Sequence, residues 1–328
     1  MYERPQDMTP LVEDARQRFG GDSWDITGGQ FSSVAIIHGA ASSYIVKTSL
    51  SLDVESAYDQ ALTEHMAIEH IDQKRSDCPV DIPQPLGIVS HEENGAWPYM
   101  AATYVPGESL DSEHSDKPFT SEERMQIGIK MGEIMLWMQT LDIDTFRPPR
   151  REPPSYPWEN WDDWFAIFAQ FDDRCFPTLC RAAATTQKQY QAFYPNGMLA
   201  AAGQLIHGDL NRFNLLSTPG SREVTGAIDF AFMRAGDTAQ EGRLFTTPFL
   251  GSEALSGCNA VLRHHGIPTL TMEQTDFWLK GPILSIALHH TQNKSAFTSF
   301  YIHSIEEVLR RWYPEEDWDR FYREYSAE

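Results

Sequence analysis

The stretch HGDLNRFNLL, residues 207–216, determines how this sequence is interpreted. It places His207, Asp209 and Asn214 between two short apolar runs. A later apolar stretch, VTGAIDFAF, is predicted to be a strand and carries a second aspartate, Asp229. Two strands joined by a short turn bring Asn214 and Asp229 together, so the pattern predicts a pair of neighbouring oxygen ligands.

Neighbouring oxygen ligands are what Mg²⁺ accepts from a protein, with nucleotide phosphates and water completing its shell. Asp209 stands across the same site as a carboxylate that can accept a proton. Phosphoryl transfer needs this arrangement, because the protein mainly positions groups and neutralises charge. The kinase pattern H-R-D-x-x-x-x-N followed by D-F-G is matched here by H-G-D-L-N-R-F-N and D-F-A. We therefore predict Asp209 as the catalytic base and Asn214 and Asp229 as Mg²⁺ ligands, with His207 supporting the motif. The alternative is a surface loop in which these polar residues occur by chance.

Two groups in the N-terminal third occur in the order that a kinase requires. A turn with two glycines lies between two strand candidates, and its residues can approach or donate to phosphates. The predicted phosphate-contacting residues of this turn are Gly28, Gly29, Ser32 and Ser33. Lys47 ends the apolar segment YIVK, and Glu64 follows 17 residues later in a helix predicted over 53–73. Lys47 and Glu64 are therefore expected to pair, although glycine pairs usually mark simple turns and strand lysines are often solvated.

The remaining elements indicate an α+β organisation. The first hundred residues are predicted to be strands with one helix, and Pro106-Gly107 marks a junction between residues 1–105 and 106–328. The second part is predicted to be mainly helical, beginning with a capping box at Thr120–Glu123. A proline-rich stretch at 147–157 is predicted to be a loop.

Composition excludes several classes of partner. The net charge is −21, with 47 acidic against 26 basic residues, which disfavours nucleic acid and anionic lipid and suits a cationic small ligand. The four cysteines form no CxxC pair, and we find neither a secretory signal nor an apolar run long enough to span a membrane. These features predict a cytoplasmic protein that is a monomer or a weak homodimer.

The sequence resembles the aminoglycoside phosphotransferase family, which includes choline kinase-like and hygromycin B phosphotransferase-like enzymes. The resemblance rests on HGDLNRFNLL, AIDFAF, the hinge-like YMAATYVPGESL and GDTAQEGRLF. It implies a two-lobed protein-kinase-like fold with ATP or GTP in the cleft, an N-terminal antiparallel sheet with one helix, and a larger, mainly helical C-terminal lobe. It also implies that Lys47 binds the α- and β-phosphates with Glu64 as its partner, and that the backbone near Thr103 and Val105 faces the adenine.

The lack of an A-P-E signature and of a phosphorylatable activation segment argues against a protein kinase, and two further departures concern single residues of the pattern. D-F-A stands in place of D-F-G, Gln139 stands where family members often have histidine, and no A-P-E signature or phosphorylatable activation segment follows Asp229.

Several acidic residues are candidates for contacting an amine of the acceptor. One group follows the metal-binding aspartate and the other lies in the aromatic stretch WENWDDWF, where tryptophan faces can also bind cations. The candidates are Asp237, Glu241, Glu159, Asp162 and Asp163. The alternative is that the aromatic residues form a core and these acids are the solvated face.

We expect an ATP- or GTP-dependent, Mg²⁺-dependent O-phosphotransferase that acts on a hydroxyl of a small cationic molecule, with aminoglycosides as the first choice. A kinase of choline, a sugar, a macrolide or a nucleoside antibiotic is the second hypothesis. The third is a nucleotide-binding pseudokinase scaffold, whose usual sign is loss of the lysine, the base or a metal ligand; all of these are present here.

Overall fold

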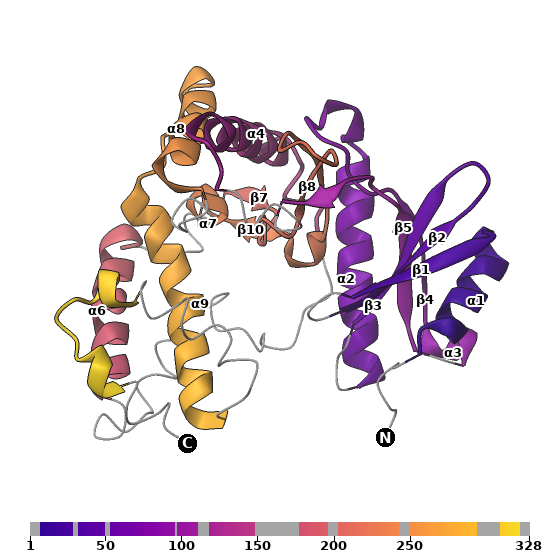
Figure 1. Ribbon diagram of the computed structural model, residues 1–328, viewed down its shortest axis with the longest axis horizontal. Coiled ribbons are helices and arrows are strands. Elements are labelled where there is room, and N and C mark those ends of the chain that lie inside the picture. Colours follow the sequence, from indigo (N-terminus) through magenta and orange to yellow (C-terminus); the bar gives the residue numbers. More distant parts are fainter. Residues whose placement is uncertain are drawn as a thin grey trace. The chain divides into compact units, whose positions relative to one another are not determined.

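The chain forms two compact units, each of which combines segments that are distant in the sequence (Figure 1). The first unit contains Met1–Arg151 and Ala202–Thr269, and the second contains Glu152–Ala201 and Leu270–Glu328. The computed structural model describes residues 7–28, 32–49, 53–95, 97–110, 118–147, 177–195, 203–242, 250–293 and 309–321.

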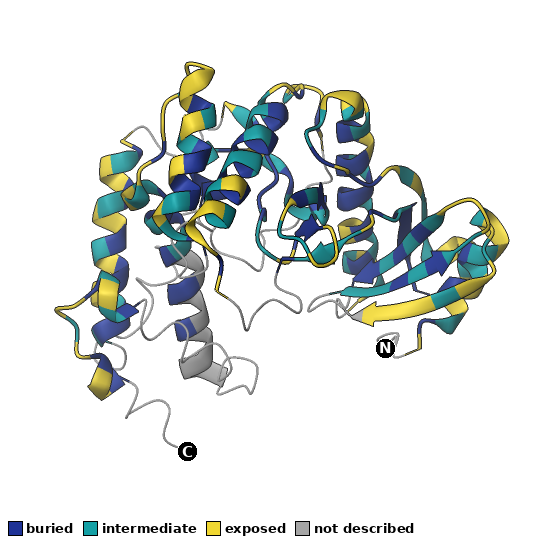
Figure 2. Cartoon of the chain, turned by 45° about the horizontal axis from the view of Figure 1, so that its top comes forward, coloured by how far each residue is buried: buried dark blue, intermediate teal, exposed yellow. Residues whose placement is uncertain are grey.

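The N-terminal part of the first unit is a five-stranded antiparallel sheet with the order β1-β2-β3-β5-β4. The strands are β1 (Ser23–Gly28), β2 (Ser32–His38), β3 (Ser43–Ser49), β4 (Pro85–Val89) and β5 (Tyr99–Thr103). Burial alternates along β2 and β3, as expected for strands whose two faces have different neighbours (Figure 2). The predicted N-terminal antiparallel sheet is therefore confirmed.

One face of the sheet packs against α1 (Thr9–Phe19), which the sequence analysis did not predict. Leu11, Val12 and Ala15 of this helix join Ile37 and Val46 of the sheet in one apolar cluster. Their spacing of one, three and four residues is that of a helical apolar face, so the signal was present in the sequence.

The other face carries α2 (Val54–Asp72), which matches the predicted helix almost residue for residue. Asp53 caps its N-terminus by accepting a hydrogen bond from the Ser56 amide at 2.7 Å. Ala61 and Ile68 of α2 lie in one apolar cluster with Met100 of β5. This packing fixes the helix on the face of the sheet that Lys47 shares.

The rest of the first unit combines helices with very short strands. α4 (Ser121–Gln139) begins at the predicted capping box, in which the Thr120 and Glu123 side chains each accept the other residue's amide. α4 packs along α8 (Gly251–His264). The short elements are α3 (His91–Asn94), β6 (Glu108–Ser109), β7 (Gln204–Ile206), β8 (Leu215–Ser217), β9 (Val224–Ala227), β10 (Arg234–Gly236) and α7 (Thr238–Glu241), with 3₁₀ turns at Arg75–Asp77 and Phe230–Phe232.

The second unit is helical where it is described. α6 (Pro177–Phe193) packs against α9 (Met272–Asn293) through an aromatic core that includes Tyr190 and Phe277. The aromatic stretch WENWDDWF, which begins at residue 158, lies outside the described residues. Among the described helices, none is both long enough and apolar enough to span a membrane.

Candidate active site

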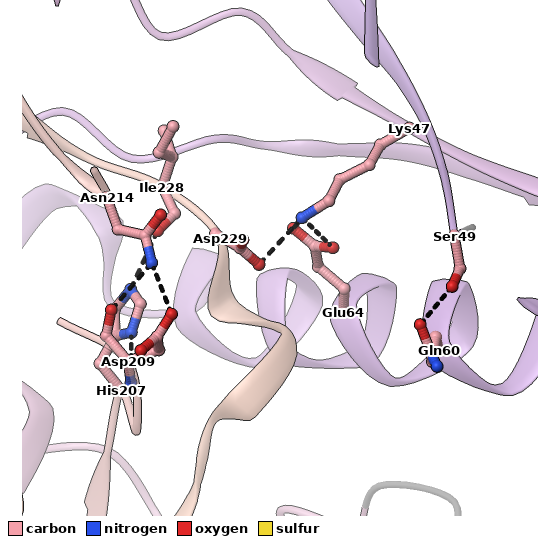
Figure 3. Close-up of polar contacts among 9 residues, drawn as sticks. All are labelled: Lys47, Ser49, Gln60, Glu64, His207, Asp209, Asn214, Ile228 and Asp229. Carbon is pink, nitrogen blue, oxygen red and sulfur yellow. Dashed lines mark hydrogen bonds and ion pairs between the residues drawn. The ribbon is translucent and has the colours of Figure 1, made fainter. Parts of the chain in front are cut away.

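Lys47 lies at the centre of a three-residue ion pair (Figure 3). Its Nζ lies 2.8 Å from Glu64 Oε2 and 2.9 Å from Asp229 Oδ1. Burial of Lys47 lowers its pKa, but the attraction of Asp229 and Glu64 outweighs burial, so its pKa lies above the ordinary value for lysine. Lys47 therefore carries a positive charge at the point where β3 meets α2.

The supporting contacts of this ion pair come from the same strand and the same helix. Ser49, two residues after Lys47, donates its hydroxyl to Gln60, one helical turn before Glu64 (Figure 3). The sequence analysis missed this second link between β3 and α2. The spacings of two along a strand and four along a helix were the signal that could have found it.

Asp229 has a strained backbone and a charged side chain. Its φ of 64° is the only positive φ of a non-glycine residue in the described part of the chain. A side chain held in this left-handed conformation costs about 1–3 kcal/mol, and such residues cluster at functional sites. Burial raises the pKa of Asp229, but the neighbouring Lys47 outweighs burial, and the pKa lies below its ordinary value. The strand predicted to run through Asp229 ends at Ala227, because the chain turns at Asp229 into a 3₁₀ turn.

Asn214 and Asp209 are joined by two hydrogen bonds (Figure 3). The Asn214 side-chain amide donates to the Asp209 carbonyl oxygen at 2.8 Å and to Asp209 Oδ2 at 3.0 Å. The amide nitrogen is thereby directed to Asp209, which leaves the side-chain oxygen of Asn214 as the atom suited to a metal. Asn214 and Asp229 together supply two hard oxygen donors, a set that fits Mg²⁺ shared with phosphates.

His207 connects the segment of Asp209 with that of Asp229. The ring is fully buried; its Nε2 lies 3.0 Å from the Ile228 carbonyl oxygen, and its Nδ1 accepts the Asp209 amide at 3.3 Å. These partners are matched by a ring that donates from Nε2 and accepts at Nδ1. The Ile228 amide donates to the Asn214 carbonyl oxygen at 3.0 Å, which ties the two segments together a second time.

The predicted nucleotide-contacting residues lie on the sheet and at its end. Gly28 closes β1 and pairs with Ser33 of β2, whereas Gly29 lies outside the described residues. Ser32 begins β2. Thr103 ends β5, where its amide donates to the Gln84 carbonyl oxygen, and Val105 is buried just beyond it.

The predicted acceptor-contacting residues have other partners where they are described. Asp237 caps α7 by accepting the Ala239 amide at 2.7 Å. Glu241 is only 4% exposed and accepts the Gly208 amide at 2.6 Å. Glu159, Asp162 and Asp163 lie outside the described residues.

The sheet and α2 present a Lys–Glu–Asp ion pair next to an Asp–Asn pair. This arrangement is that of a phosphotransferase with the protein-kinase-like fold. The family model described as "Phosphotransferase enzyme family" matches residues 26–244, which is more than half of the chain. The chain belongs to this phosphotransferase family. The resemblance stated from the sequence is thereby confirmed.

Solved structures agree with this fold over nearly the whole chain. The GDP complex of aminoglycoside 2'-phosphotransferase-IIIa has a TM-score of 0.67 at 16% identity, covering 94% of this chain and 99% of its own. Aminoglycoside phosphotransferase APH(4)-Ia has a TM-score of 0.60 at 14% identity, covering 93% and 99%. Macrolide 2'-phosphotransferase MphH from Brachybacterium faecium has a TM-score of 0.60 at 15% identity, covering 95% and 100%. The comparison with curated proteins gives no match. The predicted kinase-like fold is confirmed.

Proposed function

We propose that this phosphotransferase uses ATP or GTP to phosphorylate a hydroxyl of a small cationic molecule, with aminoglycosides as the first choice. The observation that carries the proposal is the assembled Lys47–Glu64–Asp229 ion pair next to the Asp209–Asn214 pair. A pseudokinase scaffold is disfavoured, because such a protein usually lacks at least one of these groups.

Each residue has a separate task in the proposed reaction. The charged Lys47 binds the α- and β-phosphates, and Asn214 and Asp229 hold Mg²⁺, which neutralises phosphate charge when it is bound. Asp209 orients the acceptor hydroxyl and accepts its proton. A bond forms between the acceptor oxygen and the γ-phosphorus, and the bond from that phosphorus to the oxygen bridging it to the β-phosphate breaks. The nucleoside diphosphate leaves with that oxygen.

The class of acceptor is supported by charge and by the structural neighbours. A net charge of −21 attracts cations to the protein. Solved structures with this fold include a kanamycin complex and a hygromycin B complex of aminoglycoside phosphotransferases. A macrolide phosphotransferase has a comparable TM-score, so a macrolide is our second candidate, followed by choline, a sugar or a nucleoside antibiotic.

We further propose that residues 1–105 form the nucleotide-binding lobe and residues 106–328 the catalytic and acceptor-binding lobe. Within this scheme Gly28, Gly29, Ser32 and Ser33 contact phosphate. The backbone near Thr103 and Val105 faces the base. The protein is proposed to act in the cytoplasm as a monomer or a weak homodimer.

The proposal is tested by nucleotide consumption with Mg²⁺ and a panel of aminoglycosides, macrolides, choline, sugars and nucleoside antibiotics. Asp209→Asn should lower turnover of the stimulating acceptor by about 10²–10⁴-fold, because the proton acceptor is lost. Its nucleotide dissociation constant should stay within about twofold, because Asp209 makes no proposed contact with the nucleotide. Asp59→Asn, at an exposed position of α2, removes the same charge and serves as the matched control. Near-normal turnover of Asp209→Asn would contradict the assignment of the base.

A further inference from the structure

Strand β3 and helix α2 are joined by three successive contacts, one apolar, one ionic and one a neutral hydrogen bond (Figure 3). In order along β3, the contacts are those of Ile45 with the apolar cluster of Ile68, of Lys47 with Glu64, and of Ser49 with Gln60. From one contact to the next, the chain advances two residues along β3 and goes back four residues along α2.

These two steps cover almost the same length, so the contacts stay in register. Two residues of a strand rise about 6.6 Å, and four residues of an α-helix rise about 6.0 Å. Residues two apart in β3 lie on one face of the sheet, and residues four apart lie on one face of α2. The three contacts therefore form one row, with the ion pair of Lys47 and Glu64 in the middle.

Ser49 is firmly held on the strand side of this row. It is buried, and its carbonyl oxygen accepts the indole N–H of Trp97 at 3.1 Å. The neighbouring Thr48 donates its hydroxyl to the Pro98 carbonyl oxygen at 2.6 Å. Both bonds tie the end of β3 to the segment just before β5. The Ser49 hydroxyl is therefore a fixed point from which α2 can be held.

On the helix side, the contacts around Gln60 are small and apolar. Ala57 and Ala61, three residues before and one residue after Gln60, are buried. Apolar contact is non-directional, whereas a hydrogen bond requires its donor and acceptor to be aligned. Glu64 lies one turn beyond Gln60 on the same face of α2. A rotation of the helix that breaks the bond to Ser49 therefore also displaces the Glu64 carboxylate.

We propose that Ser49 and Gln60 form a positioning pair that sets the rotation of α2 and thereby the place of Glu64 beside Lys47. This inference rests on the proposed contact of Lys47 with the nucleotide phosphates. Neither Ser49 nor Gln60 touches the nucleotide or the acceptor in this scheme. They act through Glu64, which in turn orients Lys47.

Three substitutions in the pair test this role. Ser49→Ala removes the hydroxyl, Gln60→Met keeps the length of the side chain but removes the acceptor, and Ser49→Thr keeps the hydroxyl. The kcat should fall about tenfold in the first two variants and stay within about twofold in Ser49→Thr, because small displacements of a phosphate-binding group have effects of this size. The acceptor KM should stay within about twofold in all three. Ser42→Ala and Gln73→Met, at exposed positions, are the matched controls and should leave kcat unchanged.

A second background separates positioning from a general structural role. Glu64→Gln removes the charged group through which the pair acts, and it should itself lower kcat by about tenfold or more. Adding Ser49→Ala to Glu64→Gln should then lower kcat by less than about twofold, because residues in one network are not additive. A contact that only stabilises the fold would give about the same tenfold loss in both backgrounds.

Amide hydrogen exchange gives a readout that does not depend on activity. Peptides that cover residues 54–64 should exchange faster in Ser49→Ala and in Gln60→Met, whereas peptides from α4 should stay unchanged. If Ser49→Ala does not fold, Gln60→Met, at an exposed position, gives the same comparisons.

Three results are distinguishable. Faster exchange in 54–64, together with a loss of kcat that largely disappears in the Glu64→Gln background, supports the inference. Unchanged exchange, an unchanged kcat, or an equal loss of kcat in the two backgrounds overturns it. If the wild-type protein phosphorylates no acceptor, the proposed function fails, whereas the exchange measurement still decides whether Ser49 and Gln60 hold α2.

Discussion

Lys47 holds two carboxylates that lie 17 and 182 residues away from it in the chain. The raised pKa of Lys47 means that its contribution to stability is present below about pH 10.5 and is lost as pH rises through the higher folded-state pKa. The lowered pKa of Asp229 means that its contribution is present above about pH 3.8 and is lost as pH falls through the lower folded-state pKa. The ion pair is therefore fully formed across the neutral range.

Lys47→Met should abolish phosphoryl transfer and should also lower the free energy of unfolding by about 3 kcal/mol at neutral pH, because it leaves buried carboxylates without their cation. In this variant Lys47 no longer opposes the effect of burial on Asp229, so the pKa of its carboxyl should rise above its value in the wild-type protein. A carboxyl whose folded-state pKa is higher in the variant than in the wild-type protein makes the variant relatively more stable as pH falls. The stability deficit should therefore be smaller near pH 5 than near pH 7.5.

Denaturant unfolding of both proteins at the two pH values measures this difference. Lys130→Met is the matched control, since Lys130 pairs with Glu133 near the surface of α4. The loss in free energy of unfolding of Lys130→Met should be small and nearly independent of pH. A deficit for Lys47→Met that stays constant, or grows, toward low pH would contradict the role of Lys47 as the counter-ion.

Residue types and spacings predicted the members of this ion pair but not all of its contacts. The order of Lys47, Glu64 and Asp229 along the chain identified them as a group. The bond from Lys47 to Asp229 depends on how β3 meets the turn after β9, which no local pattern records. For Glu241 the residue type suggested an exposed contact with the acceptor. Its burial and its hydrogen bond from the Gly208 amide can be seen only in the folded chain.

At the scale of elements, segments with strong local signals were predicted, whereas α1 and the turn at Asp229 were not. The helix over 53–73 and the capping box at Thr120 have strong local signals and were found at Val54–Asp72 and at the start of α4. The strand expected through Asp229 ends at Ala227, and the turn that ends it was not predicted because AIDFAF contains no Gly or Pro. The apolar pattern continues past the end of the strand because Phe230 is buried against His207, with 4.5 Å between the ring centroids.

The contact between α4 and α8 depends on glycines that have no role in backbone conformation. A Cβ at Gly128 would lie 1.9 Å from the Ala254 carbonyl oxygen, and one at Gly257 would lie 2.3 Å from the Met125 carbonyl oxygen. Glycine is therefore needed on both helices, because the backbones approach too closely for any side chain.

Gly128→Ala should lower the free energy of unfolding by about 1–3 kcal/mol, because the added methyl group forces the helices apart. Without this contact the same change in a helix interior would stabilise the protein by about 1 kcal/mol. The sign of the change in free energy of unfolding, measured by thermal or denaturant unfolding, therefore tests the contact. Gln126→Ala, on the exposed side of α4, is the control and should change stability little. A stabilised Gly128→Ala would mean that α4 and α8 do not pack in this way.

At the scale of the whole molecule, each compact unit is assembled from two separate stretches of sequence. The proline-rich loop predicted at 147–157 includes the position where the chain passes from the first unit to the second, at Arg151 and Glu152. The return at Ala202 has no comparable signal, since AAGQLI contains a single glycine. Assignment of the last residues to the second unit depends on long-range packing of α9 against α6, which local patterns do not contain.

Net charge is the property of the whole molecule that bears on the proposed acceptor. With a charge of −21, the protein should attract a cationic acceptor over a range of about 30 Å at 0.01 M salt and about 10 Å at 0.1 M salt. The kcat/KM for an aminoglycoside should therefore fall about three- to tenfold between these salt concentrations, while kcat changes little. An N-acetylated derivative of the same aminoglycoside has the same hydroxyls and fewer charges, so its kcat/KM should fall less. Equal salt dependence for the two acceptors would show that the acidic surface takes no part in capturing the acceptor. A preference for a cationic acceptor would then have to arise from contacts within the site.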